Sequence, residues 1–420
     1  MSKTKTPLRQ SSFLQKHRYS LFFFLFLVAY HVAIVNRFQP WKVDEITYSF
    51  HSVDFSLGFA TKLLPGAVFN ALFGRFASEL TASIYETVLI LLFFAGVSVF
   101  LERFLLRMQP EYRSAALVLL AFYVTGAYTF SVYTKGLGML DVYWLFFSLF
   151  FLIFLEHKWL RFLIPLLYVA SIMIHFSAIL NAIIFFSILL LYRASIEPEK
   201  KQRRIYLLIF AFSMLISAAA FLFFLVYESR LICPIETFHQ KLQEHGSDYF
   251  EYYDYAFYDL FRGDYYRPPE VSAMDGSLNK IWQLLVYQLR FNYILIDFIG
   301  SHVVIALIGG LIVLFPMMFA FYKFLLQHFR MTENLLGRFC AFLMLIQFPF
   351  TFAVAMLFSV DVNRWLTHGF LMIFTTVLLI MYYEKEKAAL LLEKIKESAG
   401  GLALKLYFLG YATIHVFAYF

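Results

Sequence analysis

Long apolar stretches separated by short polar segments recur along the whole chain. Each holds about 18 to 22 residues, enough for a helix to cross the roughly 30 Å of hydrocarbon in a membrane. The alternating segments of a membrane β-barrel are absent. The pattern therefore predicts an all-α polytopic membrane protein with about ten or eleven transmembrane helices. The predicted spans lie at 19–36, 84–101, 114–133, from Asp141 to the segment EHKWLR, twice within 162–192, and at 205–227, 298–322, 339–359, 365–383 and 402–420.

These spans form a single integral-membrane domain, 1–420, because no boundary typical of soluble domains interrupts them. Residues 55–75 are apolar but broken by Gly58, Pro65 and Gly66, which predicts short helices lying in the membrane interface. The expected parts are the first span at 19–36, an outer loop at 37–83 with the interfacial helices, spans two to seven at 84–227, a large outer loop at 228–296 and the C-terminal spans at 297–420.

Lysine and arginine gather in alternate loops. The N-terminal tail is basic from Lys3 to Arg18, whereas the loop 228–296 holds more Asp and Glu than Lys and Arg. The positive-inside rule then predicts a cytoplasmic N-terminus, and the compact loops favour a bacterial inner (plasma) membrane. The net charge of +7 comes from the basic loops, so we expect the lipid bilayer as a partner and no nucleic acid.

The first outer loop contains two adjacent carboxylates, Asp44 and Glu45, in the segment WKVDEITYSF. A carboxylate just outside a span can act as a general base toward an incoming hydroxyl. The alternative is a solvated interfacial loop in which Trp41 and Tyr48 belong to the aromatic belt. The residues alone leave both interpretations open. We expect the nearby His51 and Asp54 to lie outside the site.

Three further candidates fall on the same predicted face. Asp141 follows TKGLGML and either caps the next span or joins a site. His175 lies at the turn between two tightly joined spans, where packing is the alternative to a function. In SVDVNRW, Asp361 and Arg364 form either a local ion pair or a phosphate site in which Arg364 is the fixed cation.

The large outer loop alternates tyrosines with carboxylates in EYYDYAFYDLF. Tyrosine rings stack on the apolar faces of sugars while acids accept hydrogen bonds from sugar hydroxyls, so Tyr252, Tyr253, Asp254 and Tyr255 are candidates for acceptor binding. A disordered acidic tether is the alternative.

Ionisable residues are sparse within the spans, which disfavours an ion-coupled carrier. Motifs for nucleotide hydrolysis or zinc chemistry are absent.

Taken together, the acidic pair after the first span, the interfacial helices, Asp141 and the large loop after span seven resemble the GT-C superfamily of integral-membrane glycosyltransferases. This resemblance implies transfer of a sugar or oligosaccharide from a polyprenyl-(di)phosphate carrier to a glycan or lipid acceptor on the non-cytoplasmic face, as in polysaccharide biosynthesis for the cell envelope. It implies Asp44 or Glu45 as the catalytic carboxylate. We expect no cofactor, and because the second outer loop has no clear DxD pair, dependence on a divalent cation stays open.

A second resemblance rests on the segments IHFSAIL and DVNRW, which are similar to parts of the EpsG/Wzy-type polysaccharide polymerases. These enzymes also join lipid-linked oligosaccharides outside the membrane, and the resemblance implies that His175 and Arg364 hold a diphosphate. A non-enzymatic transporter or flippase of a lipid-linked precursor is the alternative from another class, although the chain shows none of the internal repeats that are common in carriers.

Overall fold

The structure is a computed structural model, and it describes residues 17–59, 61–75, 77–126, 128–175, 178–179, 182–231, 233–244, 301–358 and 362–417. Six of the described helices are long and apolar enough to cross a membrane, namely Arg18–Val35, Glu79–Arg107, Lys200–Phe224, Gly310–Met331, Leu335–Ala353 and Trp365–Tyr383. Shorter apolar helices cover Leu63–Phe73, Leu160–Ile174 and Ala182–Ile196. The expectation of an all-helical polytopic membrane protein is therefore confirmed.

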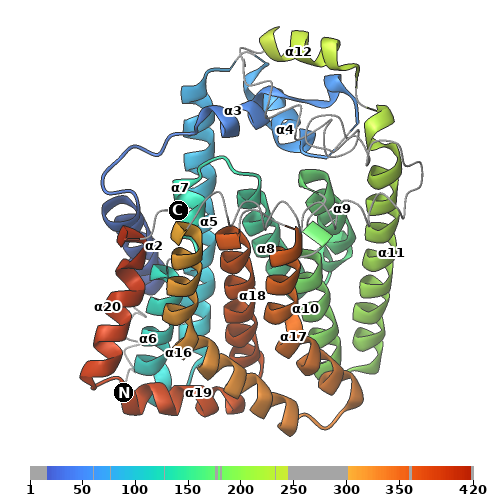
Figure 1. Cartoon of the computed structure of the whole chain (residues 1–420). Coiled ribbons are helices and arrows are strands. Elements are labelled where there is room, and N and C mark those ends of the chain that lie inside the picture. The colour runs from blue at the N-terminus through green and yellow to red at the C-terminus, as the bar shows by residue number, and fades with distance from the viewer. Residues whose placement is uncertain are drawn as a thin grey trace, which may run out of the picture.

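Short helices follow the first span at one end of the bundle. The chain runs from α2 (Arg18–Tyr30) through the π-helical turn η1 (His31–Val35) into α3 (Glu45–Ser52), the 3-10 turn η2 (Phe55–Leu57), α4 (Leu63–Phe73) and the long α5 (Glu79–Arg107). Figure 1 shows α3 and α4 lying across the end of the bundle, and we call this the α3 end. Short helices occur here as expected: α3 ends at Ser52, Asp54 caps the start of η2, and Gly58 ends η2 after one turn.

The next helices pass back and forth between the two ends: α6 (Arg113–Thr125), α7 (Ser131–Lys135), α8 (Asp141–Glu156), α9 (Ile164–Ile174), α10 (Ala182–Ile196), α11 (Lys200–Leu231) and α12 (Ile235–Glu244). The predicted span 114–133 is interrupted, because α6 ends at Thr125. A Cβ on Gly126 would collide with the Tyr411 hydroxyl, so the chain leaves the helix where another helix approaches its backbone closely.

One helix of the C-terminal group is enclosed by the others. The group comprises α16 (Ser301–Met331), α17 (Leu335–Phe358), α18 (Val362–Tyr383), α19 (Lys385–Ser398) and α20 (Leu402–Phe417). In the candidate span of α18, 94% of the residues are buried, against 22–39% in the other five, and Figure 1 shows α18 in the middle of the bundle. Polar side chains on α18 therefore face protein rather than lipid. The helix α19 lies across the opposite end, which we call the α19 end (Figure 1).

Gly66 sits where α4 crosses the end of α3. A Cβ at this position would collide with the backbone carbonyl oxygens of Phe50 and Val53. Backbone atoms cannot rotate away as a flexible side chain can, so only glycine lets α4 approach α3 this closely.

Gly66→Ala should therefore lower the free energy of unfolding by about 1–3 kcal/mol, the usual cost of forcing extra atoms into a packed contact. Thermal unfolding of the full chain in detergent measures the change. Gly410→Ala is the matched control, because a Cβ at Gly410 meets nothing within 4 Å. If both variants unfold at the same temperature, α4 does not pack on α3 as described.

Candidate functional site

Asp44 is the N-cap of α3. Its Oδ1 atom accepts hydrogen bonds from the Thr47 backbone N–H at 2.7 Å and from the Thr47 hydroxyl at 2.8 Å. The side chain is exposed at the α3 end, so capping fixes its position without removing it from solvent. A carboxylate held in one orientation and still accessible is suited to accept a proton from a bound hydroxyl. Neighbouring Lys42 pairs with Glu79 at 2.9 Å.

Directly beneath this cap, α3 is joined to α5 and α8 by a buried polar cluster of His51, Glu86 and Tyr143. The side chains of His51 and Glu86 are both 0% exposed. The Nε2 atom of His51 lies 2.7 Å from Glu86 Oε1, and the Tyr143 hydroxyl donates to the same oxygen at 2.8 Å. The cluster fixes α3, and with it Asp44, to the long apolar helix α5 and to α8.

The contacts of His51 determine where its protons lie. The Nδ1 atom is 2.8 Å from the carbonyl oxygen of Thr47, which can only accept, so Nδ1 must carry hydrogen. The Nε2 atom then either donates to an ionised Glu86 or accepts from a protonated one. In both arrangements the two side chains share one proton, and the contact is lost if either partner is removed.

The first turn of α8 also faces α18. Asp141 is the first residue of α8 and is buried, and its Oδ2 atom lies 3.6 Å from Nε2 of His368. The other ring nitrogen of His368 is 3.0 Å from the Tyr133 hydroxyl. The two ring nitrogens of His368 therefore each face an oxygen atom, one on α8 and one on α7. Asp141 also lies in the first turn of α8, where a carboxylate interacts favourably with the helix dipole.

Trp144 joins His368 to His175. Its indole N–H donates to the Ser171 carbonyl oxygen at 3.3 Å, which fixes the ring between α8 and α9. The Trp144 ring centre lies 5.5 Å from that of His368 and 6.2 Å from that of His175. Asp141 and His175, two of the predicted residues, therefore contact the same small group of side chains.

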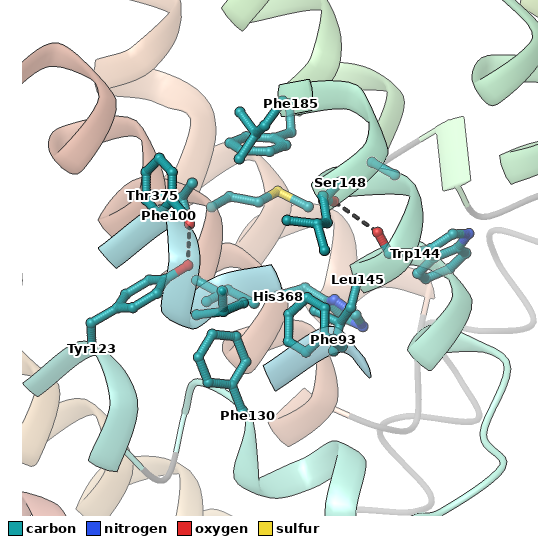
Figure 2. A pocket seen from close by; sticks show the side chains of 16 residues that line it. Phe93, Phe100, Tyr123, Phe130, Trp144, Leu145, Ser148, Phe185, His368 and Thr375 are labelled. Atoms are coloured by element: carbon teal, nitrogen blue, oxygen red, sulfur yellow. Dashed lines mark hydrogen bonds between the residues drawn. The ribbon is translucent and has the colours of Figure 1, made fainter. Parts of the chain in front are cut away.

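A narrow cavity continues from His368 into the bundle. Figure 2 shows His368, Tyr123 and Thr375 beside aromatic rings, with the hydroxyls of Tyr123 and Thr375 hydrogen-bonded at 3.0 Å. The cavity measures about 70 Å³, whereas an apolar cavity of about 150 Å³ holds a benzene-sized molecule. It is therefore too small for a sugar, and its deeper walls, such as Val97, Leu149 and Leu152, are apolar.

The loop before α8 packs on α3 in this region. A Cβ on Gly138, which has a φ of 85°, would lie 3.0–3.3 Å from atoms of Val43, Thr47 and His51. This loop leads directly into Asp141, the first residue of α8. Glycine is required at position 138 because the left-handed backbone and the close approach both exclude a side chain.

Asp54 ties η2 to the end of α4. It accepts hydrogen bonds from the Ser56 N–H at 2.8 Å and the Asn70 amide at 3.0 Å, and pairs with Arg75 at 3.2 Å. Burial acts to raise the pKa of Asp54, but these hydrogen bonds and the Arg75 charge outweigh it, so the pKa lies below its ordinary value. The stabilisation by Asp54 is present above a pH of about 3.9 and lost as the pH falls through the lowered pKa. Asp54 thus has a structural role.

Several predicted site residues lie outside the described residues: Tyr252, Tyr253, Asp254, Tyr255 and Asp361. Glu45 and Arg364 are described for their backbone alone, at the start of α3 and of α18. Arg364 precedes His368 by four residues, about one helical turn, so the two positions share a face of α18. In the described part of the chain, no three His, Cys, Asp or Glu side chains lie close enough together to hold a metal ion.

The sequence interpretation missed His368, Tyr133 and Glu86, and placed His51 outside the site. Signals for two of them were present. Glu86 is a carboxylate inside the predicted span 84–101, and His368 lies inside the predicted span 365–383. An ionisable residue within a span faces the bundle interior far more often than lipid. Nothing in the sequence marks Tyr133, because its importance follows only from the position of its hydroxyl beside His368.

Comparisons with protein-family models, curated proteins and solved structures found none that matches this chain. The assignment therefore rests on the molecule itself. Six apolar helices of membrane-spanning length among the described residues establish a polytopic integral membrane protein.

Proposed function

We propose that the chain is a membrane glycosyltransferase that moves a sugar or oligosaccharide from a polyprenyl-(di)phosphate carrier to a glycan or lipid acceptor. One observation carries the proposal. An exposed, capped carboxylate on α3 and a buried carboxylate–histidine pair between α8 and α18 are linked by the loop before α8, which packs on α3 at Gly138 and leads into Asp141. Glycosyl transfer needs two such groups, because a proton leaves the acceptor while negative charge develops on the phosphate.

The charge distribution supports an outward orientation of the α3 end. The positive-inside rule assigns the end richer in Lys and Arg to the cytoplasm. Described basic residues in or near the turns of the α19 end are Arg18, Arg103, Arg107, Arg113, Lys158, Arg161, Arg193, Lys200, Lys201, Arg203, Arg204, Lys323, Arg330, Arg338, Lys385, Lys387, Lys394, Lys396 and Lys405. Those of the α3 end are Arg37, Lys42, Lys62, Arg75, Lys135, Arg230, Lys241 and Arg364.

In the proposed reaction the acceptor hydroxyl attacks the anomeric carbon as the bond from that carbon to the carrier phosphate breaks. Asp44 accepts the hydroxyl proton through Oδ2, since Oδ1 is engaged in the cap. Glu45 orients the acceptor beside it. The electron pair of the broken bond stays on the phosphate oxygen, so the product carrier gains a negative charge.

The departing phosphate requires fixed positive charge. Arg364 supplies it, and His368, one turn further along α18 with its Nε2 atom 3.6 Å from the Asp141 carboxylate, contacts the same phosphate. His175 completes this side of the site through Trp144. Tyr252, Tyr253, Asp254, Tyr255 and Asp361 remain proposed contacts to the acceptor or carrier.

Asp44→Asn tests the assignment of the base. Asparagine caps helices as well as aspartate does, so α3 keeps its position while the proton acceptor is lost. Sugar transfer from a polyprenyl-linked donor, measured with the full chain in lipid vesicles, should fall about a hundredfold. Asp54→Asn is the matched control at the same end, and it should retain transfer. Near wild-type transfer by Asp44→Asn would show that Asp44 is not the base.

A polymerase of EpsG/Wzy type would use the same phosphate side, with His175 and Arg364 more important than Asp44. The Asp44→Asn variant separates the two, because such a polymerase keeps its activity. A flippase requires a polar path between both ends, whereas the cavity beside His368 has apolar walls. Movement of a lipid-linked sugar across vesicles without any transfer product would identify a flippase instead.

A further inference from the structure

A cleft at the α19 end lies far from the proposed reaction. It is bounded by α16, α19 and α20, and Figure 1 shows α19 running across the end of the bundle beside the other two helices. Its volume is about 300 Å³, and its walls combine the apolar Phe319, Phe324 and Leu404 with Lys323 and Lys394.

The helix α16 presents an amphiphilic stripe to this cleft. Residues spaced by four share one helix face, and the series Leu311, Phe315, Phe319, Lys323 and Gln327 changes from apolar to polar toward the α19 end. The first part of the stripe lines a second, apolar cavity of about 520 Å³, and Phe319 lines both cavities. Phe315 is 66% exposed, which leaves a large apolar ring to face the hydrocarbon of a membrane.

The two lysines in the cleft can interact with a ligand. Among the described residues, neither Lys323 nor Lys394 forms an ion pair. The neighbouring carboxylate of Glu393 accepts a hydrogen bond from Tyr112 at 2.8 Å, so it is directed toward η3 (Pro110–Tyr112). The remaining nearby acid, Glu397, is exposed on α19.

The wall formed by α19 is anchored to the bundle. Lys387 pairs with Glu384 at 2.7 Å and lies 3.0 Å from His328, while Ala388, Leu391 and Leu392 are buried. On the other wall, the Tyr407 hydroxyl of α20 donates to the Val313 carbonyl oxygen at 2.8 Å. The cleft is therefore formed by helices held in place by specific contacts.

We propose that this cleft binds an anionic membrane phospholipid. The phosphate lies between Lys323 and Lys394, where Gln327 and Ser398 can donate further hydrogen bonds, and an acyl chain follows the apolar stripe past Phe319. A soluble anion would leave the exposed aromatic rings uncovered, and a zwitterionic lipid would leave two positive charges unneutralised. Only a ligand with both an anionic head and an apolar chain matches the whole stripe, and basic pockets beside transmembrane helices are known lipid headgroup sites.

Native mass spectrometry of the full chain in detergent, titrated with dioleoyl phosphatidylglycerol or dioleoyl phosphatidylcholine, tests the proposal. Each lysine near the headgroup should contribute about fivefold in affinity, so phosphatidylglycerol should bind on the order of 30-fold more tightly than phosphatidylcholine. The double variant Lys323→Gln with Lys394→Gln should lose this preference. The matched control is Lys200→Gln with Lys201→Gln on α11, which removes the same amount of charge elsewhere at the α19 end. This control should keep the preference for phosphatidylglycerol.

Phe319→Ala should weaken the binding of both lipids severalfold, because the acyl chains of both lose the same apolar contact. Glycerol 3-phosphate, which carries the anion without a chain, should not displace phosphatidylglycerol. Thermal unfolding confirms that each variant is folded. An unchanged lipid preference in the double lysine variant, or displacement by glycerol 3-phosphate at equal concentration, would overturn the proposal.

Discussion

Glu86→Ala should destabilise the folded chain by about 2–4 kcal/mol, because removing the partner of a buried polar group costs about 1–3 kcal/mol and both His51 and Tyr143 are affected. His51 would remain 0% exposed with its Nε2 atom facing the space left by the carboxylate. The Tyr143 hydroxyl, which now donates to Glu86 at 2.8 Å, would lose this acceptor and keep its contact with Tyr85. The contact that joins α3 to α5 through His51 would be lost.

Thermal and urea unfolding of the full chain in detergent measure this loss, and protease cleavage between α3 and α4 reports on the attachment of α3. Glu79→Ala is the matched control, because Glu79 lies on the same helix and pairs with Lys42 at 2.9 Å but at the surface. Exposed pairs contribute only about 0.2–1 kcal/mol. Replacing both partners, with His51→Phe and Glu86→Leu, should cost less than Glu86→Ala alone. Equal losses in the two alanine variants would show that the buried cluster does not hold α3.

Most of the fold could be predicted from hydropathy, since lipid requires each crossing segment to satisfy its own backbone hydrogen bonds as a helix. The predicted spans 84–101, 205–227, 339–359 and 365–383 each coincide with a long helix. Where the prediction differed, as in 114–133, the cause was a contact with a distant helix at Gly126. Hydropathy carries no information about such contacts.

The candidate site could be predicted only in part, because its polar contacts join positions far apart in sequence. Tyr133 and His368 are 235 positions apart, and Glu86 and Tyr143 are 57 apart. Asp44 was recognisable as chemically interesting because two carboxylates follow the first span. Its N-cap role was also readable, since Asp immediately before a helix is a common N-cap. The arrangement of helices, rather than any local pattern, decided which polar residues meet.

Asp44→Asn combined with His368→Gln should abolish measurable sugar transfer, with an expected loss of about 10⁴-fold. The two residues act on different atoms in the proposed reaction, the acceptor hydroxyl and the departing phosphate oxygen. Losses from groups that act independently multiply, so about a hundredfold from each single variant gives the expected product. Tyr133→Phe, which removes only the hydroxyl 3.0 Å from His368, should have a smaller effect, because Asp141 still orients the ring.

The size of the combined loss distinguishes separate roles from a shared one. When two residues act as a unit, replacing either one removes their joint contribution to the rate. The double variant is then no less active than either single variant. That result would mean that Asp44 and His368 handle the same proton, and the assignment of His368 to the phosphate would be wrong. Asp141→Asn provides an independent check, because it leaves His368 in place but removes the carboxylate 3.6 Å away. If Asp141 positions His368 against the phosphate, Asp141→Asn should weaken apparent affinity for the diphosphate-linked donor and leave affinity for the acceptor unchanged.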